Sequence, residues 1–193
     1  MTEEILRLAD ALLASRGRVI AAIDGRCASG KTALAGRLQS LAGCAVFHMD
    51  DFFLRPEQRT LKRLKTPGEN VDHERFLSEA LLPLRNGAEE ISFRRFDCRT
   101  MRLGETETVR PGRFVIVEGS YSLNDALFPY YDMRIFLTVS PDEQLRRIAE
   151  REGEGGAEAF KNRWIPMEEA YFAACRPEKR CDLRFDTTGR ILE

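Results

Sequence analysis

The sequence predicts an α/β protein in which one parallel β-sheet carries helices on both of its faces. Along the 193 residues, short apolar runs alternate with stretches that have the length and spacing of helices, which is the pattern of strands and crossover helices. The first strand, at about 18–24, is built on a continuous apolar run, as expected of a strand buried on both faces. With 43% hydrophobic residues, the chain can bury one sizeable core, so we expect a single domain over 1–193.

The first half of the chain supplies two helices, a second strand and a long connection. Residues 3–15 carry apolar side chains at helical spacing, and residues 30–42 continue from the first strand as a helix. The short apolar run 45–49 predicts the next strand. The polar, basic stretch 55–69 holds two prolines and little periodicity, so we expect a long loop there. Asp72 then has the position of an N-cap for a helix with one apolar stripe.

The second half adds a hairpin, three strands and two helices. Ser140 and Pro141 open the first of these helices with an N-cap and a proline in the first turn. The glycine-rich run 153–156 is expected to end it as a flexible stop, and Pro166 is expected to kink or break the helix that follows. The expected ranges are a hairpin of 90–96 with 106–110, strands at 114–117, 133–139 and 182–185, and a last helix over 157–175.

The segment between the first strand and the second helix is the most informative part of the sequence. It reads Gly-Arg-Cys-Ala-Ser-Gly-Lys-Thr, a full match to the phosphate-binding loop, or Walker A, pattern. Its two glycines let successive backbone amides and the helix N-terminus point at the phosphates of a nucleoside triphosphate. Lys31 adds a positive charge there, and the Thr32 hydroxyl is placed to ligate Mg²⁺. The expected nucleotide-binding residues are Gly25, Arg26, Cys27, Ala28, Ser29, Gly30, Lys31 and Thr32.

Acidic residues end three of the predicted strands, and the carboxyl ends of parallel strands meet at one edge of a sheet. Asp24 ends the first strand. Glu118, after the third, has the form of the acidic residue that holds Mg²⁺ in phosphate-loop proteins, the alternative being a solvated strand-end carboxylate. Asp50, after the second, is better placed than Asp51 to accept the proton of an attacking hydroxyl. Asp51 is the alternative base, and a simple turn is the structural alternative for both.

Three arginines, Arg146, Arg147 and Arg151, lie on the helix that precedes the glycine run. Their spacing places Arg147 and Arg151 on one face, which predicts a lid over about 146–163 whose arginines neutralise the transferring phosphoryl group and exclude water. Arg163 is a further candidate. A solvated basic face is the alternative explanation for any one of them.

Composition narrows the class of partner. A net charge of −1 argues against a general nucleic-acid or membrane binder, so we expect a small-molecule partner, no nucleic acid and no membrane. Five cysteines are scattered without metal-ligand spacing, which indicates reduced thiols in a cytoplasmic protein. No signal-like segment and no apolar run of membrane length is found in the sequence.

An ordered set of motifs runs through nearly the whole chain: residues 25–32, Asp50-Asp51-Phe52-Phe53, Asn70-Val71-Asp72-His73, Phe96-Asp97, residues 115–119 and the arginines of 146–151. This set resembles the uridine kinase and phosphoribulokinase branch of phosphate-loop kinases. The resemblance implies a P-loop NTPase fold, three-layer α/β/α with a five-stranded parallel sheet and a small lid. It implies ATP as donor, Mg²⁺, Asp50 as base, and Asp72 on the ribose hydroxyls of a nucleoside. Taken alone, Asp72 is better explained as a helix cap, and one residue can serve both roles.

The same resemblance places the acceptor near Phe53, Phe96 and Asp97, within insertions at about 51–71 and 90–110. Phe53 stands where uridine kinases tend to carry tyrosine, and Phe96-Asp97 replaces Tyr-Asp. Residues 98–102 lack the histidine expected to help read a pyrimidine. An aromatic ring without a hydroxyl still stacks on a base but cannot hydrogen-bond its edge, and such polar contacts change specificity most sharply.

The expected function is therefore transfer of the γ-phosphate of ATP to the hydroxyl of a small molecule, with the 5′-OH of uridine or cytidine favoured. One alternative is a kinase of another hydroxyl metabolite, such as pantothenate, a sugar phosphate or a ribosylated vitamin. The other is a nucleotide-binding regulatory module, against which the complete set of lysine, acids and lid arginines argues. The resemblance also makes a homo-oligomer a possible state.

Overall fold

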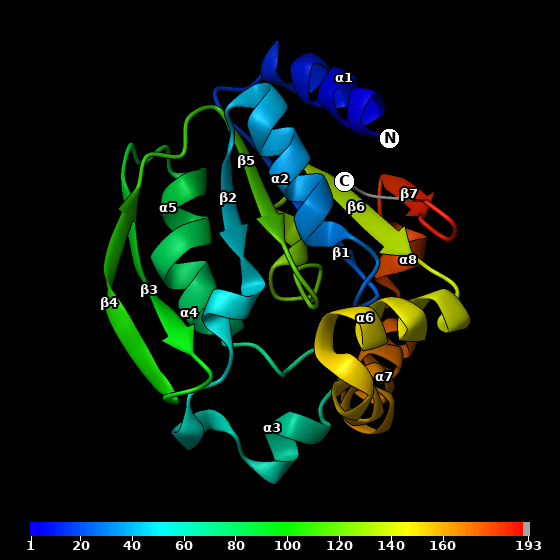
Figure 1. The fold of residues 1–193 in the computed structure, drawn as a ribbon. Coiled ribbons are helices and arrows are strands. Elements are labelled where there is room, and N and C mark those ends of the chain that lie inside the picture. The colour runs from blue at the N-terminus through cyan, green and yellow to red at the C-terminus, as the bar shows by residue number, and fades with distance from the viewer. Residues whose placement is uncertain (191–193) are drawn as a thin grey trace.

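The centre of the molecule is an all-parallel sheet of five strands in the order β2-β5-β1-β6-β7. The structure is a computed structural model that describes residues 1–190, and Figure 1 shows the sheet with helices on both sides. The predicted three-layer α/β/α fold is confirmed. The strands are β1 (Val19–Gly25), β2 (Ala45–His48), β5 (Phe114–Glu118), β6 (Met133–Thr138) and β7 (Leu183–Asp186).

Helices cover both faces of this sheet. The α-helices are α1 (Thr2–Leu13), α2 (Lys31–Ala42), α3 (Leu61–Lys65), α4 (His73–Phe76), α5 (Leu82–Arg85), α6 (Pro141–Ala159), α7 (Ile165–Cys175) and α8 (Pro177–Arg180). Shorter 3₁₀ turns lie at Met49–Phe52, Pro56–Gln58 and Phe128–Tyr130, and π-helical turns at Leu77–Leu81 and Phe160–Trp164. No helix within residues 1–190 is long and apolar enough to cross a membrane.

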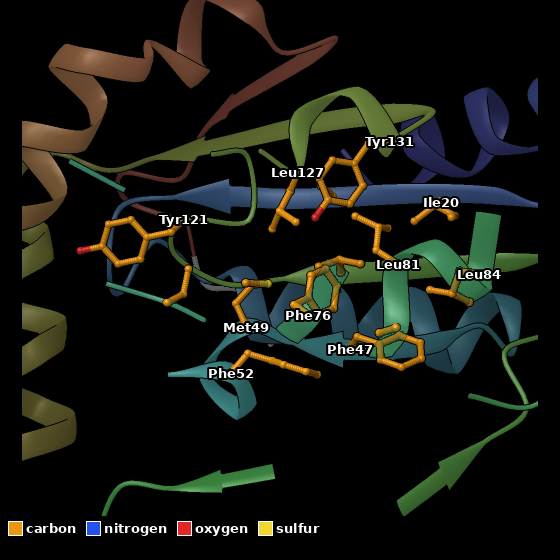
Figure 2. Close-up of a cluster of buried hydrophobic side chains, with 14 of the residues drawn as sticks. Ile20, Phe47, Met49, Phe52, Phe76, Leu81, Leu84, Tyr121, Leu127 and Tyr131 are labelled. Carbon is orange, nitrogen blue, oxygen red and sulfur yellow. The ribbon is translucent and has the colours of Figure 1, made fainter. Parts of the chain in front are cut away.

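Alternate side chains of β1 enter two separate hydrophobic cores, because successive residues of a strand point to opposite faces. Ala21 and Ile23 pack with the buried faces of α1 and α2. Ile20 and Ala22 pack on the other side, against α4, α5 and the segment between β5 and β6. Figure 2 shows this second core, where Phe76 of α4 lies among side chains of β1, β2 and the 121–131 segment. The all-apolar strand predicted from the sequence is therefore the layer between the two cores.

The predicted hairpin is present as β3 (Ile91–Asp97) and β4 (Arg102–Val109), and both strands extend further toward the turn than expected. Ile91 and Phe93 of β3 are buried in the second core, whereas β4 is largely exposed. The hairpin thus forms an outer layer beside α4 and α5 (Figure 1), and its turn extends toward the carboxyl edge of the sheet.

The stretch 55–69, expected to be a loop, contains a 3₁₀ turn and α3. The Thr60 side chain caps α3 by accepting from the backbone N–H of Arg63 at 3.2 Å. The Arg63 guanidinium in turn donates to Glu74 of α4 at 2.6 Å and to the Glu69 carbonyl at 3.2 Å. Sequence composition missed these helical turns because capping and ion pairing, rather than apolar periodicity, hold them.

The glycine run interrupts α6 as predicted. The backbone of Gly153, with φ 74° and ψ 172°, is not helical, so two helical segments meet there at a kink and the second runs to Ala159. Glycine adopts this conformation readily because it has no Cβ. A π-helical turn then precedes Pro166, which lies in the first turn of α7 and cannot donate a backbone hydrogen bond. Gly153 therefore lies at the joint between two helical segments within the predicted lid.

Candidate active site

The phosphate-binding loop connects β1 to α2 and depends on two glycines with positive φ. Gly25 has φ +138°, and a Cβ there would lie 2.0 Å from the Leu137 carbonyl oxygen of β6. Gly30, with φ 89°, is the N-cap of α2, and no side chain in the described part of the protein caps that helix. The amides of the first turn therefore point into the loop, the arrangement that binds phosphate. The Lys31 ammonium folds over the loop and donates to the carbonyls of Gly25 and Arg26, each at 2.8 Å.

Asp24, the acid at the end of β1, supports the loop from beneath. Its fully buried carboxylate accepts from the backbone N–H of Gly25 at 2.6 Å, from that of Leu123 at 2.9 Å, and from the Tyr171 hydroxyl at 2.7 Å. Burial raises the pKa of Asp24 to about 6, and the hydrogen bonds partly oppose this shift. One side chain thus joins the loop, the turn after β5 and α7.

Glu118 and Thr32 lie together at the edge of the loop. The Thr32 hydroxyl is 3.2 Å and 3.3 Å from the two carboxylate oxygens of Glu118, which is buried. A hydroxyl and a carboxylate are hard oxygen ligands, so this donor set fits Mg²⁺. The structure adds a residue that the sequence analysis missed, because His48 Nδ1 lies 2.5 Å from Glu118 Oε1. That hydrogen bond raises the pKa of His48. The sequence shows that His48 and Glu118 each lie at the end of a predicted strand. In the structure these two strands are neighbours and the two residues are in register.

The structure separates the two candidate bases. Asp50 lines the cavity next to the loop, and burial together with the charge of Glu118 raises the pKa of its carboxyl. Asp51 does not line that cavity and instead lies 3.6 Å from the Arg95 guanidinium. This geometry favours Asp50, because a general base must reach the hydroxyl that it deprotonates.

These groups share one cavity of about 660 Å³, a volume within the usual range for small-molecule sites. One side is formed by the phosphate loop and by α6 and α7, the other by the segment after β2 and the tip of the β3–β4 hairpin. Figure 1 shows these two groups of elements on either side of the carboxyl edge of the sheet. The cavity therefore extends from the phosphate-loop side to a second side formed by the segment after β2 and the hairpin tip.

Arg147 and Arg151 both line the cavity, as their shared helical face predicted. Arg147 donates to the Ala28 carbonyl of the loop at 3.2 Å and to the Thr187 carbonyl at 2.7 Å. Arg151 is more exposed and pairs with Glu152 at 2.8 Å. Arg147 is thus fixed against the loop, whereas Arg151 stands at the mouth of the cavity.

The other two lid arginines lie elsewhere. Arg146 points outward and pairs with Glu143 at 2.7 Å and with Glu150 at 2.5 Å. Arg163 stacks on Trp164, with its guanidinium carbon 4.5 Å from the ring centroid, and does not line the cavity. Arg146 and Arg163 therefore fit the alternative explanation, in which these arginines belong to a basic face outside the cavity.

Of the four expected acceptor residues, only Phe53 lines the cavity. Asp72 is buried and caps α4 by accepting from the Arg75 N–H at 3.2 Å. Phe96 is buried in the hairpin, and the Asp97 carboxylate accepts from the Arg99 N–H at 2.7 Å in the hairpin turn. The cavity wall on this side is completed by residues that sequence reasoning did not select, namely Arg59, Asn70, Cys98 and Tyr121.

Glu168 of α7 is another residue that the sequence analysis missed. Its buried carboxylate accepts from the backbone N–H of Cys27 in the phosphate loop at 2.9 Å and from the Ser120 hydroxyl at 2.6 Å. No local pattern marks it, because its partners lie 141 and 48 residues away. The contact connects α7 to the phosphate loop.

No family model matches the chain. It is similar to the structure of a possible uridine kinase from Bacillus stearothermophilus, with 24% identity, a TM-score of 0.68, and coverage of 95% of this chain and 98% of that one. It is also similar to D-glycerate 3-kinase from Cryptococcus neoformans (15% identity, TM-score 0.64, coverage 97% and 93%). For phosphoribulokinase from Rhodobacter spheroides the identity is 14%, the TM-score 0.60, and the coverage 89% and 71%. These likenesses show that the chain has the fold of P-loop kinases.

Proposed function

We propose that this protein is a small-molecule kinase that transfers the γ-phosphate of ATP to a hydroxyl group. The observation that carries the proposal is the convergence on one cavity of the phosphate loop, the Thr32–Glu118 pair and the carboxylate of Asp50. A protein that only binds nucleotide has no need of a further carboxylate, that of Asp50, in the cavity beside the loop. The kinases of the same fold support this class of reaction.

In this proposal each residue has one task. The loop amides and Lys31 hold the phosphates of ATP, and Thr32 and Glu118 hold Mg²⁺, which neutralises phosphate charge when bound. Asp50 orients the acceptor hydroxyl and accepts its proton as the hydroxyl oxygen bonds to the γ-phosphorus and the bond to the ADP oxygen breaks. Arg147 and Arg151 stabilise the charge on the transferring group and limit the access of water.

The position of Asp72 bears on which acceptor the protein uses. The sequence resemblance favours the 5′-hydroxyl of uridine or cytidine, with Asp72 on the ribose. In the structure, however, Asp72 caps α4 and does not line the cavity. This observation favours the alternative of a different small hydroxyl metabolite.

The test is acceptor-dependent release of ADP from ATP and Mg²⁺, measured for the parent protein, Asp50→Asn and the neighbouring control Asp51→Asn. The acceptors are nucleosides, pantothenate, hydroxy acids and sugar phosphates, with a blank that holds no acceptor. We expect Asp50→Asn to bind ATP as the parent does and to transfer phosphate roughly 10²–10⁴-fold more slowly. Asp51→Asn should retain turnover. If Asp50→Asn keeps full turnover, Asp50 is not the base; tight ATP binding with no acceptor-dependent ADP would favour a regulatory module.

A further inference from the structure

Four cationic side chains line the cavity, and among the described residues Arg59 is the one with neither an anionic partner nor an oxygen acceptor. Lys31 donates to loop carbonyls, Arg147 pairs with Glu143 at 2.8 Å, and Arg151 pairs with Glu152. Arg59 makes no ion pair with any described residue, and its one hydrogen bond goes to the sulfur of Met101 at 3.7 Å. Thioether sulfur is a weak acceptor, so the guanidinium of Arg59 keeps nearly all of its binding capacity for a ligand.

Asn70 is the second polar group on this wall with unused capacity. It is only 4% exposed, it lines the cavity, and its side-chain amide makes no hydrogen bond within residues 1–190. Its backbone is fixed because the adjacent Val71 pairs with Phe53 in a β-bridge. Its amide atoms are not among the fully buried polar atoms without a partner in residues 1–190, so they are open to the cavity that Asn70 lines. The amide can therefore hydrogen-bond a polar group that enters the cavity.

Arg59 and Asn70 line the cavity from the same part of the chain. Both belong to the connection between the 3₁₀ turn that carries Asp50 and helix α4. Figure 1 shows α3, in the middle of this connection, across from α6 and α7. The connection is held in place by the Arg63–Glu74 ion pair at 2.6 Å. The two side chains are thus presented by a braced segment that begins at the proposed base.

From these observations we infer that the acceptor carries an anionic group, a carboxylate or a phosphate, in addition to its hydroxyl, and that Arg59 and Asn70 bind that group. The inference rests on the proposed kinase function. A planar guanidinium offers paired N–H donors that match carboxylate and phosphate oxygens, and the amide of Asn70 adds further donors. Uridine and cytidine have no such group, so they are not the preferred acceptors under this inference.

The first test compares acceptors that differ only in the anionic group: D-glycerate with glycerol, pantothenate with panthenol, and ribose 5-phosphate with ribose, alongside uridine and cytidine. We expect the anionic member of at least one pair to be the best acceptor. Whether that acceptor carries a carboxylate or a phosphate shows which of the two groups the site binds. Arg59→Gln should lower kcat/KM for that acceptor by roughly 10- to 100-fold, mainly through KM, and leave the KM for ATP unchanged. The matched control is Arg99→Gln, because Arg99 is an exposed arginine of the nearby hairpin turn, next to Cys98, and makes no ion pair with a described residue.

A second measurement is independent of turnover. Cys98 is exposed and lines the cavity on the same wall as Arg59, so a bound anion should slow the alkylation of Cys98 by iodoacetamide. The reaction is run with ADP and Mg²⁺ present, and the extent of alkylation is measured by mass spectrometry. D-Glycerate or inorganic phosphate should protect Cys98 in the parent protein and in Arg99→Gln but not in Arg59→Gln. The inference is overturned if the protein phosphorylates nucleosides as well as it phosphorylates the anionic acceptors and if Arg59→Gln leaves kcat/KM unchanged. The proposed kinase function would then still stand. If none of the acceptors is phosphorylated, the proposed kinase function is wrong. The anion site is then supported if anions protect Cys98 in the parent protein but not in Arg59→Gln, and it is rejected if they protect neither or both.

Discussion

Replacing Tyr171 by phenylalanine tests the role of Asp24 in supporting the phosphate loop. The Tyr171 hydroxyl is buried and donates to the Asp24 carboxylate at 2.7 Å. A hydrogen bond to a charged group contributes about 1.5–3 kcal/mol, so we expect a loss of about 2 kcal/mol in the free energy of unfolding at pH 7.5. In a chain of this size, that loss corresponds to a fall of roughly 4–8 °C in Tm.

The loss should depend on pH, because it depends on the ionisation of Asp24. The pKa of Asp24 is raised from 3.8 to about 6 by burial, so its contribution to folding is most favourable below pH 3.8 and is lost as pH rises through about 6. Removing the Tyr171 donor raises this pKa further and therefore destabilises most above pH 6. At pH 5, where Asp24 is largely protonated in the folded protein, the loss should fall to about 1 kcal/mol, the value for a neutral hydrogen bond.

Urea unfolding at pH 5 and pH 7.5 measures both values, and Tyr131→Phe is the matched control. The Tyr131 hydroxyl is also buried, but it has no hydrogen-bond partner among the described residues, so its removal should be neutral or stabilising at either pH. A Tyr171→Phe protein that is no less stable than Tyr131→Phe at pH 7.5 would refute the reasoning. So would a loss that is the same at both pH values.

Three further substitutions address the loop and the lid. Lys31→Ala should abolish nucleotide binding and turnover, measured by titration with ATP·Mg²⁺ and by ADP release. Gly25→Ala should cost at least about 3 kcal/mol in thermal unfolding, because its Cβ would lie 2.0 Å from a carbonyl of β6, whereas Gly36→Ala, on the exposed face of α2 with open space around it, should stabilise by about 0.5–1 kcal/mol. Arg147→Gln should lower kcat roughly 10²–10³-fold and Arg146→Gln should leave it unchanged; equal losses would contradict the placement of the lid arginines.

The sheet and the nucleotide side of the site could be predicted because their signals are local. The strand 114–117 is recognisable from its own apolar residues, and the loop from a pattern of eight residues. The approach of Glu118 to Thr32 also followed without coordinates, since parallel strands bring their carboxyl ends to one edge of the sheet. Each of these inferences needed only the strand pattern and one general rule of topology.

The acceptor side could not be predicted, because its geometry depends on contacts between distant residues. Arg59 lies in a stretch of polar composition that resembles many solvated loops, and only the folded chain shows that it faces the cavity. Glu168 reaches Cys27 across 141 residues, and no sequence pattern marks such a pair. Asp72 was ambiguous for a different reason, since a helix cap and a substrate ligand require the same residue type.

The order of the strands in the sheet determines when this protein can begin to fold during synthesis. Within the sheet, β1 pairs with β5 and β6, and β2 pairs only with β5. Until residue 118 has left the ribosome, both early strands lack every neighbour that they have in the native sheet, and the hairpin β3–β4 is the one native strand pair that can form within the described residues. Apolar strands with open edges are prone to association. Chains that terminate before β5 should therefore aggregate or recruit chaperones, although they already contain the complete nucleotide-binding motif.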